Sequence, residues 1–225
     1  MDIQAVCFDM DGTLIDTERY YRICWPRAVA SFGCVMTDEQ ALIMRSLGRP
    51  FAARQLQEWF GDKLEYQMVR EKRQELMEEY LKKEGIRCKP GALALLRALK
   101  ERQIITAVVT ATDLGRTERY LRETGLYGYF DRLVSARQVP EGKPSPHVYR
   151  YACQQIGIEP QDCVAVEDAP NGVMSAFRAG CKVIMVPDQT QPDEKLCRCL
   201  YAKADSLEEI PGILDEADRG DIGSQ

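Results

Sequence analysis

Short apolar runs without polar interruption alternate with helical patterns through most of this sequence. The runs that read as strands cover residues 3–8, 104–110, 133–135, 163–167 and 182–186. Helical periodicity lies between them, at residues 92–101, 116–124, 146–156 and 171–179. Uninterrupted runs suit strands that are buried on both faces, and a helix between successive strands suits parallel pairing. The sequence therefore predicts an α/β fold, a doubly wound parallel sheet with helices on both sides.

One long stretch breaks this alternation. Between residues 18 and 87 the sequence has helical periodicity and no strand candidate. The apolar positions that share one helical face there are Leu64, Met68, Leu76, Tyr80 and Leu81. The charged residues between them are typical of a solvated helix face and not of a binding patch. We expect a small inserted α-helical domain, residues 17–87, in a core domain made of residues 1–16 and 88–225.

Composition and charge narrow the functional classes. The 30 basic and 35 acidic residues give a net charge of −5 without a basic stripe, which argues against a nucleic-acid or anionic-membrane partner. No stretch approaches the roughly 20 apolar residues that a membrane span needs. The first residues enter a strand pattern directly and do not resemble a secretory signal. We expect a soluble, cytoplasmic protein.

The cysteines do not form a disulfide framework. Their number, nine, is odd and their spacing is irregular. Four of them lie in apolar periodic segments: Cys7, Cys153, Cys163 and Cys181. We expect these to be buried, reduced thiols. Cys197 and Cys199 are separated by one residue and are too isolated for a zinc site. Their role stays open.

Pairs of carboxylates follow two of the predicted strands directly. Asp9 and Asp11 end the first run, and Glu167 and Asp168 end the fourth. Because ligands bind at the carboxyl ends of the strands in an open parallel sheet, we expect these acids to converge. Close carboxylates repel one another unless a cation is present. With oxygen ligands and no histidine or cysteine nearby, the sequence predicts a site for a hard ion, Mg²⁺.

The other residues at this edge suit a phosphoryl group. The second predicted strand ends in Thr110, and a Gly-Lys-Pro-Ser-Pro segment brings Lys143 to the same region. Backbone N–H groups of Gly12 and Thr13 are available to an anion. Each feature alone also suits an ordinary turn or helix cap, but a cation, a lysine and free amides together favour phosphoryl transfer. One aspartate can then attack phosphorus while the other transfers protons.

Four segments together resemble the motifs of the haloacid dehalogenase-like phosphohydrolases. They are Asp-Met-Asp-Gly-Thr-Leu-Ile-Asp at 9–16, Thr110, the Gly-Lys-Pro-Ser-Pro-His-Val-Tyr segment around Lys143, and Val-Glu-Asp-Ala-Pro-Asn-Gly at 166–172. Their order and spacing agree with the family over nearly the whole chain. The last two are especially similar to the subgroup that contains β-phosphoglucomutase and several sugar-phosphate phosphatases.

This resemblance implies a role for each residue. Asp9 would be the nucleophile and a Mg²⁺ ligand, and Asp11 the general acid/base, with its backbone carbonyl on the metal. Asp168, with Glu167 nearby, would complete the metal site. The residues that would bind the phosphoryl oxygens are Thr110, Ala111 and Lys143. The helical block would be the family's cap, which closes over the site and excludes water.

Two positions in the helical block concern the substrate. Arg49 resembles the cap-loop arginine that meets a distal anionic group of the substrate, with a solvated arginine as the alternative. Tyr21 stands where β-phosphoglucomutases carry a histidine. The chain has one histidine, His147, which starts a predicted helix and is expected to cap or pack there. The missing histidine favours a phosphatase over a mutase.

The expected function is hydrolysis of a small phosphorylated metabolite, a sugar or polyol phosphate, with Mg²⁺ and an aspartyl-phosphate intermediate. A phosphomutase of the β-phosphoglucomutase type is the alternative on the same residues, and a non-enzymatic interaction protein is a remote one. Dehalogenation is disfavoured, because that chemistry in the superfamily lacks the Asp11 acid/base and the metal. We expect a monomer, which is common for this architecture.

Overall fold

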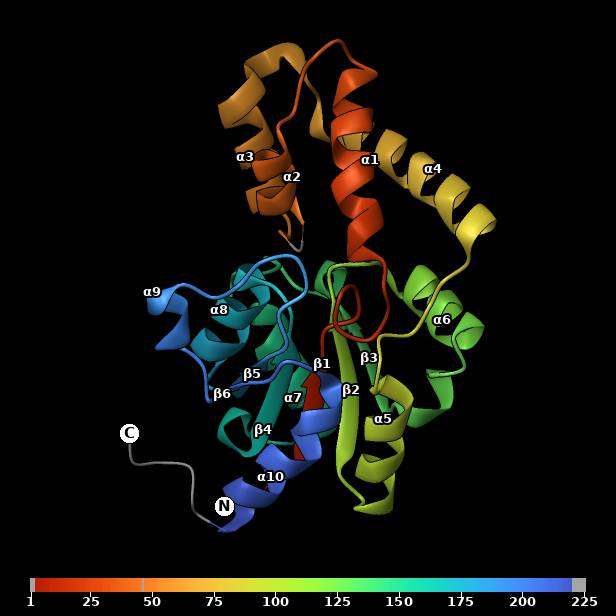
Figure 1. Ribbon diagram of the computed structural model, residues 1–225. Coiled ribbons are helices and arrows are strands. Elements are labelled where there is room, and N and C mark those ends of the chain that lie inside the picture. The colour runs from red at the N-terminus through yellow and green to blue at the C-terminus, as the bar shows by residue number, and fades with distance from the viewer. Residues whose placement is uncertain (1–2, 46, 220–225) are drawn as a thin grey trace.

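A parallel sheet of six strands forms the centre of the computed structural model, which describes residues 3–45 and 47–219. Its order is β3-β2-β1-β4-β5-β6 (Figure 1). The strands are β1 (Ala5–Phe8), β2 (Ile105–Thr110), β3 (Arg132–Ser135), β4 (Cys163–Glu167), β5 (Lys182–Met185) and β6 (Ala202–Lys203). All five predicted strands are confirmed, with small shifts at their ends. The short β6 was not predicted, because two residues carry no periodic signal.

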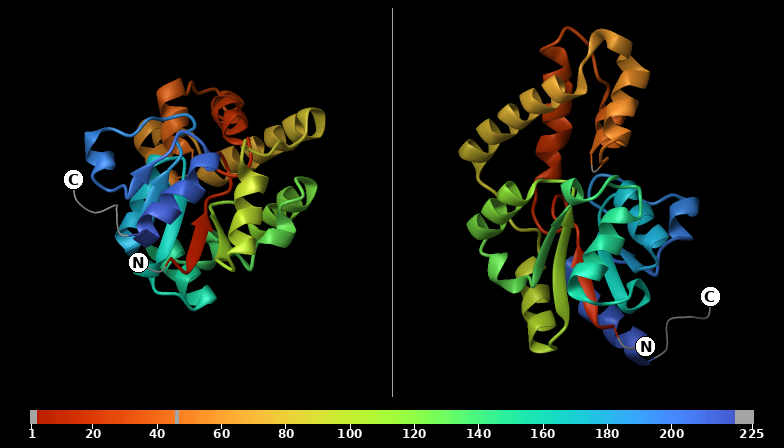
Figure 2. Two further views of the ribbon diagram at one scale, coloured as in Figure 1. Left: turned by 60° about the horizontal axis from the view of Figure 1, so that its bottom comes forward. Right: turned by 180° about the vertical axis from the view of Figure 1, so that it is seen from behind.

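Helices cover both faces of the sheet, because successive residues of a strand point to opposite sides. On one face, Val6 and Phe8 of β1 join an apolar cluster. Three helices that cover this face contribute to the cluster, namely α5 (Ala92–Glu101), α6 (Leu114–Glu123) and α10 (Ile210–Arg219), and two helices between β1 and α5 also reach it. On the other face, Ala5 and Cys7 join a second cluster. Its helices are α7 (His147–Ile156), α8 (Pro170–Ala179) and α9 (Glu194–Cys197). The doubly wound α/β prediction is therefore confirmed, as the views in Figure 2 show.

Four α-helices lie between β1 and α5 in the described part of the chain and stand above the carboxyl end of the sheet (Figure 1). They are α1 (Glu18–Ala30), α2 (Asp38–Met44), α3 (Phe51–Phe60) and α4 (Tyr66–Glu84). Trp25, Met44 and Leu56 lie in an apolar core that belongs to these helices. We call this segment the cap. Its predicted limits, 17 and 87, stay a prediction.

The two linkers between cap and core run side by side. The backbone N–H of Asp16 donates to the Arg87 carbonyl at 2.9 Å, and the N–H of Lys89 donates to the Leu14 carbonyl at 2.8 Å. An antiparallel bridge between Ile15 and residue 88 lies between these bonds. The chain therefore enters and leaves the cap at one place.

The predicted apolar stripe is confirmed in part: Leu64 and Leu81 are buried, and Leu76 and Tyr80 pack against the core. Met68, expected in the apolar stripe, is 53% exposed. The buried residues of α4 are Val69, Arg70, Arg73, Met77 and Leu81. The prediction was wrong for Met68 and for two of the charged residues, because part of this helix faces a polar pocket. Two charges expected in solvent, those of Arg70 and Arg73, are buried instead.

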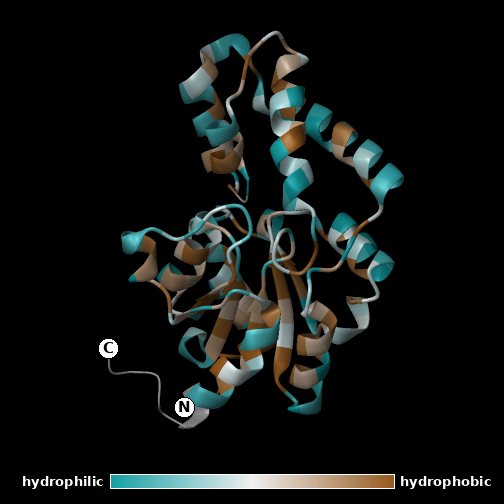
Figure 3. Cartoon of the chain, viewed as in Figure 1, coloured by the Kyte–Doolittle hydropathy of each residue, from teal (hydrophilic) through white to brown (hydrophobic). Residues whose placement is uncertain are grey.

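The hydropathy of the chain follows the layers. Figure 3 shows strongly apolar strands inside the sheet and mixed apolar and polar helices around it. The four thiols predicted to be buried, those of Cys7, Cys153, Cys163 and Cys181, are buried. Within the described ranges, no helix has both the length and the apolar character needed to cross a membrane.

Candidate active site

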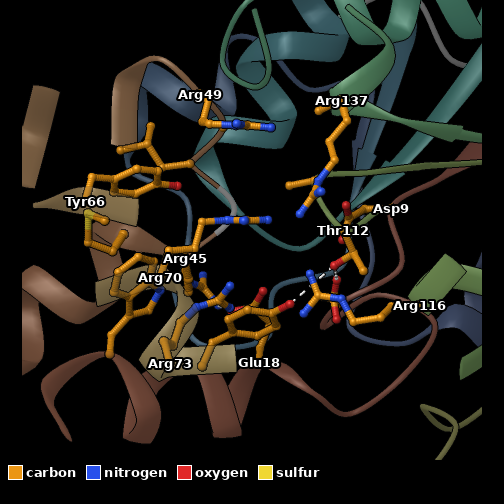
Figure 4. A pocket seen from close by; sticks show the side chains of 18 residues that line it. Asp9, Glu18, Arg45, Arg49, Tyr66, Arg70, Arg73, Thr112, Arg116 and Arg137 are labelled. Atoms are coloured by element: carbon orange, nitrogen blue, oxygen red, sulfur yellow. Dashed lines mark hydrogen bonds and ion pairs between the residues drawn. The ribbon is translucent and has the colours of Figure 1, made fainter. Parts of the chain in front are cut away.

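The polar residues that follow the strands meet at the carboxyl edge of the sheet, beneath the cap. Strand β1 lies between β2 and β4, so the connections diverge at its tip, where doubly wound sheets bind ligands. A pocket between core and cap is lined there by Asp9 and Asp11 after β1 and by Ala111 and Thr112 after β2 (Figure 4). The structure thus has a pocket at the edge of the sheet where the sequence predicts the site.

Asp9 and Lys143 form an ion pair at the base of the site. The Lys143 ammonium donates to Asp9 Oδ1 and lies 2.7 Å from Glu167 Oε1. The Tyr149 hydroxyl, which the sequence did not single out, donates to the same Glu167 oxygen at 2.5 Å. Burial would lower the pKa of Lys143, but Asp9 and Glu167 outweigh it and raise that pKa above its ordinary value. The lysine is therefore charged at neutral pH.

Three of the four predicted acids gather in one group. One carboxylate oxygen each of Asp9, Glu167 and Asp168 lies within 4.8 Å of the others. Burial is the main cause that raises the pKa of Asp9, and it raises the pKa of Asp168 to about 7. Glu167 Oε2 is buried and has no hydrogen-bond partner among the described atoms. Gathered carboxylates with an unsatisfied oxygen are a donor set that fits a hard divalent cation.

Asp11 faces hydroxyl groups instead of these acids. The Thr17 hydroxyl donates to Asp11 Oδ1 at 2.6 Å, and the Thr112 hydroxyl donates to Oδ2 at 2.9 Å. Thr110 lies beneath, fully buried, with its hydroxyl 3.5 Å from Asp11 Oδ2. Of the predicted phosphate-binding residues after β2, Ala111 lines the pocket and Thr110 is not among the lining residues. Thr112 lines it too and was not predicted.

Two charged cap residues, Glu18 and Arg45, lie next to the group of acids. The sequence analysis did not identify either of them. Arg45 Nη1 lies 3.4 Å from Asp168 Oδ2 and 3.9 Å from Glu18 Oε2. Its Nη2 donates to Thr190 Oγ1 at 3.0 Å. Burial, reinforced by Asp168, raises the pKa of Glu18. A charge within a helical segment was the only sequence signal for either residue, and solvated charges give the same signal.

The cap is docked on the loop that carries the lysine. The Gly48 N–H donates to the Lys143 carbonyl, and the Gly142 N–H donates to the Arg49 carbonyl, each at 2.8 Å. A Cβ atom at Gly48 would lie 2.7 Å from Gly142 Cα and 2.9 Å from the Lys143 nitrogen. These are backbone atoms that cannot move aside cheaply. Only glycine allows this approach, so the structure shows the cap closed over the site.

The remaining predicted residues occupy different positions. Arg49 lines the pocket and its side chain is exposed. Tyr21 lines the pocket as well, with its hydroxyl 3.3 Å from Thr112 Oγ1. His147 is not among the lining residues, and its Nδ1 lies 3.1 Å from Ser145 Oγ at the start of α7. Helix α7 has no side-chain cap hydrogen bond and the His147 side chain is 43% exposed, so the expected capping or packing role stays a prediction.

Comparisons with known proteins agree with the motifs. The family model described as haloacid dehalogenase-like hydrolase matches residues 3–180. Hexitol phosphatase A of Escherichia coli (strain K12) is 34% identical over 186 residues, which are 83% of this chain and 84% of that protein. The phosphorylated carbohydrates phosphatase of Thermotoga maritima is 31% identical over 223 residues, 95% of this chain and 99% of that protein.

A solved structure extends the likeness to the fold. CbbY from Rhodobacter sphaeroides, in complex with phosphate, has a TM-score of 0.77 at 28% identity and covers 95% of this chain and 99% of its own. A mutant of the same CbbY in which one aspartate is replaced by asparagine, in complex with xylulose-(1,5)bisphosphate, has a TM-score of 0.76 at 27% identity, over 92% of this chain and 96% of its own. With its four motifs, its fold and these relatives, the chain belongs to the haloacid dehalogenase-like hydrolases, the enzyme family that its sequence predicted.

Proposed function

We propose that this protein is a Mg²⁺-dependent phosphatase of a small sugar or polyol phosphate. The observation that carries the proposal is the buried group of Asp9, Lys143, Glu167 and Asp168 at the tip of β1, with Asp11 beside it. The names of the relatives, a hexitol phosphatase and a phosphorylated carbohydrates phosphatase, support this substrate class.

Asp9 is the proposed nucleophile. One of its oxygens attacks phosphorus, the bond from phosphorus to the substrate's ester oxygen breaks, and an aspartyl-phosphate forms. Lys143, already within reach of Asp9, offers an ammonium group to the phosphoryl oxygens. Ala111, together with Thr110, would complete the contacts on the side of β2. The docked cap would exclude bulk water during this step.

Asp11 is the proposed general acid and base. It gives a proton to the departing ester oxygen and takes one from the water that attacks the aspartyl-phosphate, so that an alcohol and inorganic phosphate leave. The Thr17 and Thr112 hydroxyls hold its two oxygens apart from the group around Asp9. This separation leaves Asp11 free for proton transfer.

Asp9, Glu167 and Asp168 would hold the Mg²⁺ ion, and the backbone carbonyl of Asp11 would be a further ligand. When bound, the ion supplies positive charge to the phosphoryl oxygens and allows these acids to stay ionised together. Arg45 and Lys143 neutralise part of the remaining charge.

Several broader predictions belong to this proposal. The cap, residues 17–87, would open and close over a core of residues 1–16 and 88–225, of which 1–2 and 220–225 lie outside the described residues. The protein would be a cytoplasmic monomer without a nucleic-acid or membrane partner. The assignment of Arg49 to substrate binding is supported by its place in the pocket wall.

Phosphorus NMR separates the phosphatase from the mutase. The protein is incubated with Mg²⁺, β-glucose 1-phosphate and a trace of the 1,6-bisphosphate, and with p-nitrophenyl phosphate in a second sample. We expect inorganic phosphate from at least the second sample. Formation of glucose 6-phosphate would establish the mutase despite Tyr21, and an inert protein in both samples and with a panel of sugar and polyol phosphates would overturn the proposal.

A further inference from the structure

Six arginines line the pocket, and five of them form no ion pair with Asp9, Asp11, Glu167 or Asp168 in the described structure. Arg45 is the exception, because it pairs with Asp168 and Glu18. The other five, here called the arginine cluster, are Arg49, Arg70, Arg73, Arg116 and Arg137. They come from the cap loop, α4, α6 and the segment after β3, and Figure 4 shows them around one space.

The arginine cluster has little negative charge of its own. Among the described residues, Asp113 is the only carboxylate in ion-pair contact with it, 2.6 Å from Arg116 Nε and 3.6 Å from Arg137 Nη2. Five guanidinium groups thus share one carboxylate. Like charges repel strongly where water is partly excluded. Because Asp113 neutralises only one of these charges, the cluster needs further negative charge from a ligand.

Arg70, 9% exposed, meets a neutral partner. The Gln74 amide is oriented with its side-chain oxygen toward the arginines, the orientation that satisfies both ends of the amide. In this orientation the oxygen accepts from both terminal nitrogens of Arg70, at 3.0 and 3.2 Å, and from Arg116 Nη2, at 3.1 Å. Burial, and then the charges of Arg137, Arg73 and Arg116, lower the pKa of Arg70 to about 10. A guanidinium with a lowered pKa is one that its surroundings do not neutralise.

Arg73 is buried more deeply, at 5% exposure, and also lacks an acid. Its guanidinium lies over the rings of Tyr21 and Trp25, 4.7 and 5.0 Å from their centres. Its Nε is buried and has no hydrogen-bond partner among the described atoms. Because a buried donor without an acceptor is costly, this atom points to an acceptor from outside the chain.

We propose that the substrate carries a second phosphate, which the arginine cluster binds while Asp9 attacks the first. This proposal rests on the phosphatase function above and specifies its substrate as a bisphosphate. A carboxylate would neutralise one of the clustered charges, whereas a phosphate monoester carries about two and has three acceptor oxygens. Planar guanidinium groups bind such oxygens in pairs. The unneutralised charge of the cluster therefore favours phosphate.

The cluster lies within reach of a short substrate. The ring of Tyr21 lies under Arg73, and its hydroxyl is 3.3 Å from Thr112 Oγ1. The Thr112 hydroxyl in turn donates to Asp11 Oδ2 at 2.9 Å. One tyrosine side chain thus spans from the cluster to the residue next to the proposed general acid. This separation suits a carbon chain of sugar or polyol length with a phosphate at each end.

Alkanediol bisphosphates test the proposal without a choice of sugar stereochemistry. For each diol from propanediol to hexanediol, kcat/KM for phosphate release with Mg²⁺ is compared between the bisphosphate, the monophosphate and the phosphorylated carboxylic acid of equal length. At the best length we expect the bisphosphate to exceed the monophosphate by at least about tenfold, a modest share of what charge-assisted contacts can supply. Equal values at every length would overturn the proposal, and preference for the phosphorylated acid would replace the second phosphate by a carboxylate.

Variants assign the preference to the cluster. Arg70→Met and Arg73→Met keep the apolar stem and remove the charge, and each should bring the bisphosphate-to-monophosphate ratio close to one. Arg54→Met is the matched control, because Arg54 is an exposed cap arginine on α3 outside the pocket lining. The ratio compares two substrates on one sample, so partial loss of folded protein does not change it. An unchanged ratio in both variants would overturn the assignment.

Failure of the phosphatase function has a different signature, the absence of phosphate release from any substrate, p-nitrophenyl phosphate included. Calorimetry with butanediol bisphosphate then decides the inference separately. Binding that Arg70→Met weakens by about tenfold or more would keep a bisphosphate ligand for the pocket, and binding that is absent or indifferent to Arg70 would remove it.

Discussion

The two ends of the pocket treat charge in opposite ways. At the core end, Asp9 faces Lys143, Asp168 faces Arg45, and threonine hydroxyls bind Asp11. At the cap end, the five arginines of the cluster, three from the cap and two from the core, share Asp113. The core end needs one cation to be complete, whereas the cap end needs an anion that only a ligand supplies. We infer that the sheet edge carries the reaction chemistry and that the arginine cluster, to which cap and core both contribute, selects the substrate.

Asp9→Asn breaks the core end and should have the largest effect. An amide cannot form the aspartyl-phosphate, so kcat should fall by about 10⁴-fold or more, as for other nucleophile deletions. Phosphate release from p-nitrophenyl phosphate measures it, and circular dichroism with Tm verifies the fold. Asp62→Asn, an exposed acid in the cap, is the control. Turnover close to the control's value would remove Asp9 from its proposed role.

Gly48→Ala breaks the contact between the two ends. The new Cβ would collide with the backbone at Gly142 and Lys143, so the cap loop must move away and the lysine loop loses two hydrogen bonds. Misplacement of about 1 Å typically costs about 10²-fold in rate, and we expect kcat/KM to fall by this order. Gly128→Ala, where nothing lies within 4 Å of the added atom, should retain wild-type activity. Equal rates for the two variants would contradict a closed working state.

The pH dependence of stability sharpens the picture of the core end. The ordinary pKa of an aspartate is 3.8, and burial raises the pKa of Asp168 to about 7 in the folded, metal-free protein. The folded chain thus binds more protons than the unfolded chain across this window, and stability falls as pH rises through it. After chelation, Tm should rise by a few degrees when pH drops from about 8 to 6.

Addition of Mg²⁺ tests the same window from the other side. The cation competes with protons for the acids, so it should raise Tm more at about pH 8 than at about pH 6. Asp168→Asn removes the titrating group and should flatten both dependences. A chelated protein that becomes less stable on acidification over this range would contradict the charge excess at the core end.

Arg70→Met tests the cap end by stability and should have the smallest effect. Removal of an unneutralised buried charge should stabilise the free protein, by about 1 kcal/mol, or a few degrees in Tm. Inorganic phosphate should then raise the Tm of the wild type more than that of the variant. Arg54→Met serves again as the exposed control. A marked loss of stability in Arg70→Met would mean that the protein itself supplies the missing counterion.

Much of the core could be predicted because its signals are local. Apolar runs mark strands that are buried on both faces, and residues placed directly after them must reach the same edge of a parallel sheet. This argument places Asp9, Glu167 and Asp168 together from the sequence alone, and the Gly-Lys-Pro-Ser-Pro segment adds Lys143. It did not separate Asp11 from the other acids, because the direction of a side chain depends on the hydroxyl groups around it.

The cap end could not be predicted in the same way. A charged residue in a helix has the same local pattern whether it faces solvent or a polar pocket. The surroundings of Arg70 and Arg73 depend on how α4 lies over the core, which is a property of docking and not of periodicity. Thr112 and Tyr149 were missed for a related reason, since their partners lie far away in the chain.

The paired linkers at Asp16 and Arg87 have a consequence for how such a protein changes over evolutionary time. Seen from the sheet, the whole cap begins and ends like a hairpin loop, because its two ends are neighbours. Insertions at closely spaced ends are tolerated well. One helical module can therefore be exchanged for another without disturbing β1 or α5, and a new metabolite can be recruited to an old reaction by replacement of a single continuous segment.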